Sequence, residues 1–192
     1  MNQATIACYD YLFRPAQRWL EVPILLSFNL ILVASAYLSI NLPFSPVPIT
    51  GQTLGVLLIA MALGRVRGTA IVLAYLLEGM AGLPVFAGGR SGMAALMGPT
   101  GGYLFGFLGA AYIVGYLSDK GWYSGYLKSV AAMTVGTATI FICGLAWLGV
   151  MVPDGAMLEM GLYPFLPGAL IKVTVAAIVL PTICRFVGRE EK

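Results

Sequence analysis

The sequence predicts an all-α integral membrane protein with six transmembrane helices, built as a single membrane domain over residues 1–192. Only 10% of the 192 residues are charged, whereas about 25% are charged in a typical soluble protein. Hydrophobic residues make up 59% of the chain, and the mean hydropathy is +0.89. Several uncharged runs approach the ~20 residues that a helix needs to cross the hydrocarbon core of a bilayer.

Six segments are predicted to cross the membrane. The first, residues 22–40, contains 19 uncharged positions and ends before NLPFSPVPITG, whose three prolines and glycine are incompatible with a continuing helix. Charged residues precede this run and no small-residue cleavage site follows it cleanly, so we expect a retained helix rather than a signal peptide. The two short segments that follow are separated by a basic turn. The expected helices are approximately 22–40, 52–64, 67–83, 100–118, 128–152 and 167–187.

The distribution of basic residues predicts the orientation of the chain. With six crossings and both termini in the cytoplasm, nine basic residues lie on the inner side, and among the outer loops only Arg90 is basic. Such an asymmetry follows the positive-inside rule. The nine inner residues are Arg14, Arg18, Arg65, Arg67, Lys120, Lys128, Arg185, Arg189 and Lys192.

Composition excludes several classes of function. The chain has no histidine, the commonest metal ligand and general base, and its three cysteines are far apart with no CxxC spacing. We therefore expect no metal site, no bound cofactor and no enzymatic activity. The net charge of +3 is too small and too dispersed to predict nucleic-acid binding. The glycine-rich segment GPTGGYLF lacks the lysine of a phosphate-binding loop.

Two ionisable residues, Glu78 and Lys172, fall inside predicted spans. Such residues are costly in a bilayer and are functional candidates by default. Counted from the neighbouring prolines, both lie about 8–9 Å below the outer helix ends at ~1.5 Å per residue. With Arg90 in the loop above, they predict a polar pocket that opens outward. The alternatives are a structural Glu78–Lys172 ion pair between two helices, or side chains that reach along the lipid to the interface.

The first predicted helix contains a small-xxx-small pair, Ser35 and Ser39. Such a spacing lets another helix approach closely, so this pair is a candidate contact with a membrane partner.

Four segments, in order, resemble the BioY family, the biotin-specific substrate-binding (S) components of energy-coupling factor (ECF) transporters. The segments are SPVPITGQTLGVLLIAMALG, YLLEGMAGLPVFAGG, GPTGGYLFGF and PFLPGALIK, and the resemblance runs from about residue 24 to 184. It implies a multi-pass protein of the cytoplasmic membrane that binds biotin from outside with high affinity. The loop between the first two helices would close over the ligand. It also implies a transmembrane T protein and two cytoplasmic ATPases as partners, although some members are thought to work without a dedicated module.

The resemblance also implies a ligand site. The arginine after GLPVFxGG is Arg90 and the lysine of PGxLIK is Lys172. Biotin has a carboxylate, an apolar thiophane ring and a ureido group with two N–H donors and one carbonyl. We expect Arg90 to pair with the carboxylate and Lys172 to donate to the ureido carbonyl, with Glu78 accepting from the ureido N–H groups. The other candidates are Thr50, Gly51 and Gln52 near the closing loop, and Tyr103 and Phe86 as apolar walls.

One position departs from the family pattern. The family commonly has aspartate in PGDLIK, whereas this chain has Ala169. A carboxylate lost there and one present at Glu78 suggest a compensating exchange. The remaining functional alternatives are an S component for another vitamin such as thiamine or riboflavin, an intramembrane enzyme, and a purely structural membrane subunit.

Overall fold

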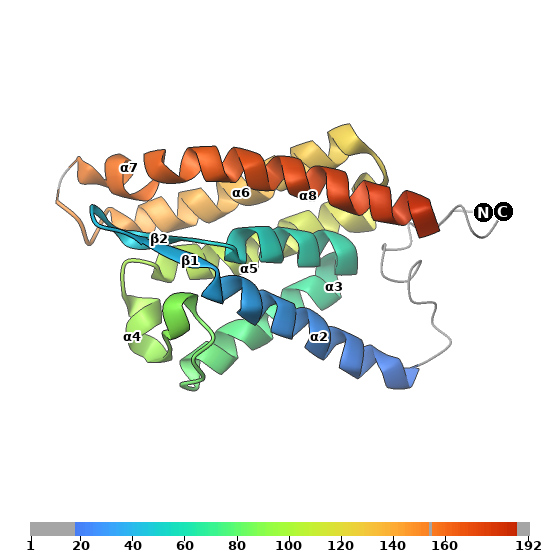
Figure 1. Ribbon diagram of the computed structural model, residues 1–192, viewed down its shortest axis with the longest axis horizontal. Coiled ribbons are helices and arrows are strands. Elements are labelled where there is room, and N and C mark those ends of the chain that lie inside the picture. The colour runs from blue at the N-terminus through green and yellow to red at the C-terminus, as the bar shows by residue number, and fades with distance from the viewer. Residues whose placement is uncertain (1–17, 154, 188–192) are drawn as a thin grey trace.

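The computed structural model describes residues 18–153 and 155–187 and is mostly helical. Its long helices lie side by side along one axis, as Figure 1 shows. A two-stranded hairpin and two short helices cluster at one end of this bundle. The elements are α2 (Arg18–Tyr37), β1 (Ser39–Leu42), β2 (Ser45–Thr50), α3 (Gln52–Met80), α4 (Gly92–Met97), α5 (Gly101–Asp119), α6 (Tyr126–Leu148), α7 (Ala156–Gly161) and α8 (Leu166–Val187), with 3-10 turns at Ala87–Gly89, Trp122–Ser124 and Tyr163–Phe165.

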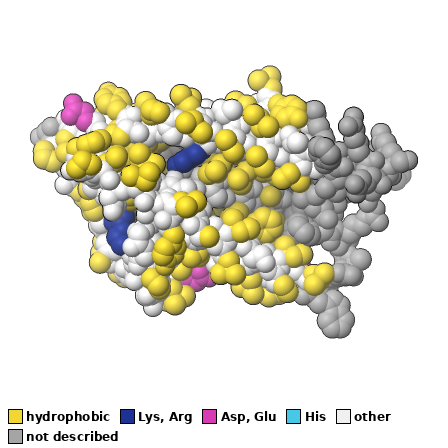
Figure 2. Space-filling model, viewed as in Figure 1, with side chains coloured by type: hydrophobic (Ala, Val, Ile, Leu, Met, Phe, Trp, Pro, Cys, Tyr) yellow, Lys and Arg dark blue, Asp and Glu magenta, His cyan; other side chains and the backbone are white. Residues whose placement is uncertain are grey.

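Five helical segments of the described chain are long and apolar enough to cross a membrane: Leu20–Tyr37, Gln52–Met80, Gly101–Asp119, Tyr126–Leu148 and Ala156–Ile183. The surface agrees with this assignment, because the face in Figure 2 is largely covered by hydrophobic side chains with few charged groups between them. In water such a surface would be unfavourable, whereas in a bilayer it faces lipid tails of the same polarity. The chain is therefore a multi-pass membrane protein.

Helix α3 has a sharp break at Gly64. This residue has φ 76° and ψ −175°, a conformation that glycine adopts without the steric penalty of a Cβ atom. In Figure 1 the chain reverses its direction at this break, so that both halves of α3 extend from it toward the hairpin end of the bundle. They correspond to the two short helices predicted at 52–64 and 67–83, although the second ends at Met80 rather than at residue 83.

The core of the bundle lies between α3 and α5. Within one 18-residue apolar stretch of each of these two helices 61% of residues are buried, compared with 17% for α2 and 22% for the segment that contains α8. Small residues on α5, such as Ala110 and Ala111, are fully buried, and α6 packs on the other side of α5. Close packing of small residues is the usual way in which helices associate in lipid, where the hydrophobic effect supplies little attraction between them.

The hairpin β1–β2 adds one pair of strands to the mostly helical fold and corrects the boundary of the first predicted helix. Helix α2 ends at Tyr37, and residues that were assigned to its last turn or to a loop form an antiparallel pair with Ser39 opposite Thr50 and Ile40 opposite Ile49. Prolines 46 and 48 favour extended backbone and cannot donate a ladder hydrogen bond, so they fit an edge strand. Proline-rich sequence predicts a helix end, but whether it then forms a loop or a strand depends on what the hairpin packs against.

The predicted helical pair Ser35 and Ser39 does not form. Ser39 lies in β1, and Ser35 faces the start of α3, where a Cβ atom added to Gly55 would lie 2.8 Å from Ser35 Oγ. The hydroxyl of Ser35 donates to the carbonyl of Leu32 at 2.6 Å. The small residues of this segment therefore allow α2 and α3 of the same chain to approach closely, and the geometry does not support the partner contact expected there.

The described basic residues of the predicted inner side belong to helix ends that meet at the end of the bundle opposite the hairpin (Figure 1). There the Nε atom of Arg67 lies 2.9 Å from Oε1 of Glu21, and the guanidinium of Arg65 lies over the rings of Tyr112 and Tyr116. The expected inner residues Arg14, Arg189 and Lys192 are outside the described residues.

Candidate functional site

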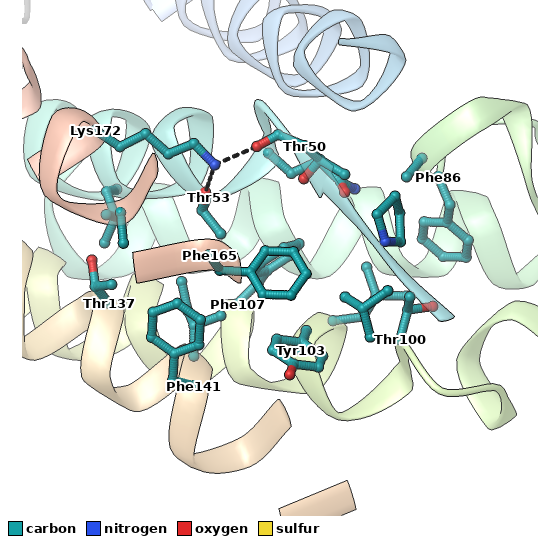
Figure 3. Close-up of a pocket in the computed structure, with 18 of the residues that line it drawn as sticks. Thr50, Thr53, Phe86, Thr100, Tyr103, Phe107, Thr137, Phe141, Phe165 and Lys172 are labelled. Carbon is teal, nitrogen blue, oxygen red and sulfur yellow. Dashed lines mark hydrogen bonds between the residues drawn. The ribbon is translucent and has the colours of Figure 1, made fainter. Parts of the chain in front are cut away.

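A cavity opens at the hairpin end of the bundle, between β2, the first half of α3, the turn after Pro84, and helices α5, α6 and α8 (Figure 3). Its volume is about 780 Å³, a figure that includes open solvent at its mouth. The lining residues are Val47, Pro48, Thr50, Gln52, Thr53, Leu57, Phe86, Ala87, Arg90, Ala95, Thr100, Tyr103, Leu104, Phe107, Thr137, Ile140, Phe141, Phe165, Ala169 and Lys172.

Lys172 enters the cavity from α8. Its Nζ atom donates to the backbone carbonyl of Thr50 at 2.5 Å and to the hydroxyl of Thr53 at 2.8 Å, as the dashed lines in Figure 3 mark. An ammonium group has three donors, so these two bonds leave one for a ligand. The bonds also fix the side chain in one direction and connect α8 to the junction between β2 and α3.

Arg90 reaches the cavity from the turn that follows Phe86. The backbone N–H of Phe86 donates to the carbonyl of Arg90 at 3.0 Å, and Arg90 Nε donates to the carbonyl of Ala87 at 3.1 Å. These bonds position the base of the side chain and leave the paired terminal N–H groups of the guanidinium, the arrangement that binds a carboxylate bidentately.

Phe86, Tyr103, Phe107 and Ile140 provide buried apolar walls, each at most 7% exposed. The ring of Phe86 meets Tyr75 edge to face, with centroids 5.5 Å apart and an interplanar angle of 77°. The hydroxyl of Tyr103 donates to the carbonyl of Gly161 at 2.8 Å, so that this group is satisfied within the protein. The walls therefore suit an apolar ring rather than a polar one.

Gln52 begins α3 and is also buried. Its side-chain Nε2 donates to the hydroxyl of Tyr75, which in turn donates to the carbonyl of Val85 at 2.9 Å. This chain of bonds links the first half of α3, the second half of α3 and the turn that carries Phe86. Gln52 thus holds together three segments around the cavity.

Six of the eight predicted ligand residues meet at this cavity: Thr50, Gln52, Phe86, Arg90, Tyr103 and Lys172. Gly51 and Glu78 are not among its lining residues. Gly51 instead precedes α3, and its N–H donates to the carbonyl of Leu38 at 2.8 Å.

Glu78 does not meet Lys172 as the matching depths suggested. The face of α3 that packs inward carries Tyr75 and Gly79, one turn apart and both buried, and Glu78 lies off this face and is half-buried. Lys172 bonds to Thr50 and Thr53 instead. Similar depth along two helices does not by itself bring two side chains together, because the direction of each side chain depends on the rotation of its helix.

Sequence reasoning missed many of the lining residues, among them threonines, aromatic residues and aliphatic residues. Thr137, Ile140 and Phe141 share one face of α6 through i, i+3 and i+4 spacing, and Thr53 and Leu57 share one face of α3. The spacing is visible in the sequence, but uncharged residues at helical spacing are common on every apolar helix. Only the packed structure distinguishes the cavity face from the others.

The fold and the cavity define a class: a multi-pass membrane protein with a cavity at one end of its helical bundle, lined by two cationic side chains and aromatic walls. Comparison with known proteins identifies the family. The BioY family model matches residues 16–189, and the chain belongs to this family.

Curated relatives support this membership. The chain is 40% identical over 157 residues to a biotin transporter BioY of Thermotoga maritima, covering 79% of this chain and 88% of that protein. It is 39% identical over 161 residues to a biotin transporter BioY of Rhizobium etli, covering 79% and 86%. Among solved structures, the S-component for biotin from an ECF-type ABC transporter superposes with a TM-score of 0.77 at 26% identity, covering 85% of this chain and 90% of the other.

Proposed function

We propose that this protein binds biotin and takes it up across the cell membrane as the substrate-binding S component of an ECF transporter. The observation that carries the proposal is the cavity itself, where Arg90, Lys172 and a set of buried aromatic walls meet in a chain of the BioY family. Membership of a family of transporters also places the chain among transport proteins rather than enzymes.

The chemistry of the cavity matches biotin group by group. The free terminal N–H groups of Arg90 suit the carboxylate of the valerate tail. The remaining donor of Lys172 suits the ureido carbonyl, and Phe86, Tyr103 and Phe107 suit the thiophane ring. Gly51 and Glu78 are left out of this proposed site because neither lines the cavity.

We further propose six membrane crossings with both ends of the chain in the cytoplasm. The two halves of α3 on either side of Gly64 then count as separate crossings. The gathering of described basic side chains at the end opposite the cavity supports an outward-facing site. The hairpin β1–β2 would cover this site, and Ser45 Oγ already donates to the carbonyl of Met160 in α7 at 2.6 Å.

The likeness to an ECF S-component supports a transmembrane T protein and two cytoplasmic ATPases as partners. The alternative is a solitary biotin transporter without a dedicated ATPase module. Copurification of the tagged protein from its native membrane, followed by identification of the bound subunits, separates the two.

Isothermal titration calorimetry of the purified protein in detergent micelles tests the proposed ligand. We expect saturable one-to-one binding of biotin with a Kd below the micromolar range, and no saturable heat with thiamine or riboflavin at the same concentrations. Binding of either of these vitamins in place of biotin would assign the chain to another S-component specificity. Absence of saturable biotin binding would refute the proposal.

A further inference from the structure

Thr137 carries a buried hydroxyl without a hydrogen-bond partner on the wall of the cavity. Among the described residues, buried side-chain atoms that lack a partner include Asn29 Nδ2, Thr69 Oγ1 and Thr137 Oγ1. Of these three residues only Thr137 lines the cavity. A buried polar group without a partner is unfavourable, and such groups in native proteins call for an explanation.

Other threonines on α6 and α8 show the hydrogen bond that a helical threonine usually makes to its own helix. Thr134 and Thr139, on the same helix α6, donate to the carbonyls of Val130 and Val135, four residues earlier, at 2.8 and 2.9 Å. Thr174 and Thr182 on α8 do the same. This local bond is available to any helical threonine, so the hydroxyl of Thr137 is turned away from a partner that its neighbours use.

Thr137 lies on the face of α6 that lines the cavity. Ile140 and Phe141, three and four residues later, line the same cavity. In Figure 3 Thr137 lies at the end of the view where Lys172 enters, with its hydroxyl turned toward that side, and Phe86 lies at the opposite end. Lys172 thus lies at the same end of this view as Thr137, and its ammonium group bonds to Thr50 and Thr53.

This end of the cavity has a shortage of acceptors. No described lining residue is acidic, the hydroxyl of Thr53 and the carbonyl of Thr50 already accept from Lys172, and position 169 is alanine. An ammonium group only donates, whereas a hydroxyl both donates and accepts. A ligand head that has N–H donors beside a carbonyl needs an acceptor here as well as the donor that Lys172 supplies.

We infer that Thr137 is a ligand-binding, specificity-determining residue, whose hydroxyl accepts a hydrogen bond from an N–H of a cyclic urea while Lys172 donates to its carbonyl. This inference rests on the proposed binding of biotin. It assigns to α6 the acceptor role that the sequence suggested for Glu78.

The test compares Thr137→Val with the wild-type protein by titration with biotin, biotin methyl ester and desthiobiotin, all of which keep the ureido group. We expect the variant to bind each of the three about 5- to 10-fold more weakly, the usual effect of one lost hydrogen bond. Thr137→Ser, which keeps a hydroxyl, should restore most of the affinity. Thr134→Val on the same helix is the matched control and should bind as the wild type does.

Thermal unfolding without ligand separates ligand binding from a structural role. Since Thr137→Val removes an unpartnered buried hydroxyl, its Tm should equal or exceed that of the wild type, whereas loss of a structural hydrogen bond would lower it. The inference is overturned if Thr137→Val binds biotin within twofold of the wild type. It is also overturned if the loss disappears with the methyl ester or with desthiobiotin, because the hydroxyl would then contact the tail or the sulfur. Failure of the wild-type protein to bind biotin would instead refute the proposed function.

Discussion

Replacement of Lys172 by methionine is the sharpest test of how the cavity binds its ligand. Methionine is of similar length and apolar, so the change removes the ammonium group and little volume. The wild-type group makes hydrogen bonds of 2.5 and 2.8 Å to Thr50 and Thr53, and its third donor faces the ligand in the proposed complex. A charged hydrogen bond contributes about 1.5–3 kcal/mol, and loss of one partner of a buried polar contact costs roughly 2–5 kcal/mol in binding.

We therefore expect Lys172→Met to raise the Kd for biotin by about 30-fold to several thousandfold. The Tm of the ligand-free protein should change less, because removal of a partly buried charge is favourable and offsets the loss of the two hydrogen bonds. Calorimetric titration measures the first effect and thermal unfolding of the ligand-free protein measures the second. Lys128→Met, an exposed lysine at the other end of the bundle, is the control. A Kd of Lys172→Met within threefold of the wild type would refute the assignment of Lys172 to the ligand.

Three other changes test the remaining parts of the site. Arg90→Gln should weaken biotin by at least about tenfold, since a bidentate charged contact is lost, but should change the Kd of biotin methyl ester by less than threefold; equal losses for both would place Arg90 away from the carboxylate. Gly79→Ala should weaken binding of biotin, because the added methyl group overlaps the ring of Phe86 and displaces that wall of the cavity. The control in the same titration is Gly168→Ala, where an added Cβ atom has open space. Glu78→Leu should leave the Kd for biotin within twofold of the wild type, because Glu78 does not line the cavity. A Kd raised tenfold or more would instead support the hypothesis that Glu78 replaces the carboxylate absent at position 169.

Much of the fold can be predicted from the sequence because a membrane helix is recognisable as a run of about 20 uncharged, mostly apolar residues. Uncharged runs and their flanking charges determined where helices lie, and the prolines of NLPFSPVPITG correctly placed the end of the first run within a few residues. Local sequence did not reveal that this same segment pairs as a hairpin. Strand pairing between residues 39 and 50 depends on the register of two segments and on the helices beneath them.

The candidate site was only partly predictable, for a related reason. Arg90 and Lys172 stand out because charges are rare in this chain, and both reach the cavity. Glu78 stands out equally and does not line it. Whether Glu78 or Lys172 faces the cavity depends on the rotation of its helix about the helix axis, and packing against neighbouring helices sets that rotation. Thr137 went unnoticed since its distinguishing property, an unused hydroxyl, exists only in the folded protein.

The hydrogen bond between Lys172 and the carbonyl of Thr50 has a consequence for how the site opens. Thr50 is the last residue of β2, so the hairpin is anchored inside the cavity by the same side chain that is expected to contact the ligand. In the proposed complex a ligand that binds Lys172 would alter the restraint on the hairpin, and by thermodynamic reciprocity displacement of the hairpin would alter the affinity for the ligand to the same extent. In the proposed complex, opening of the hairpin and release of the ligand would then be coupled through a single ammonium group.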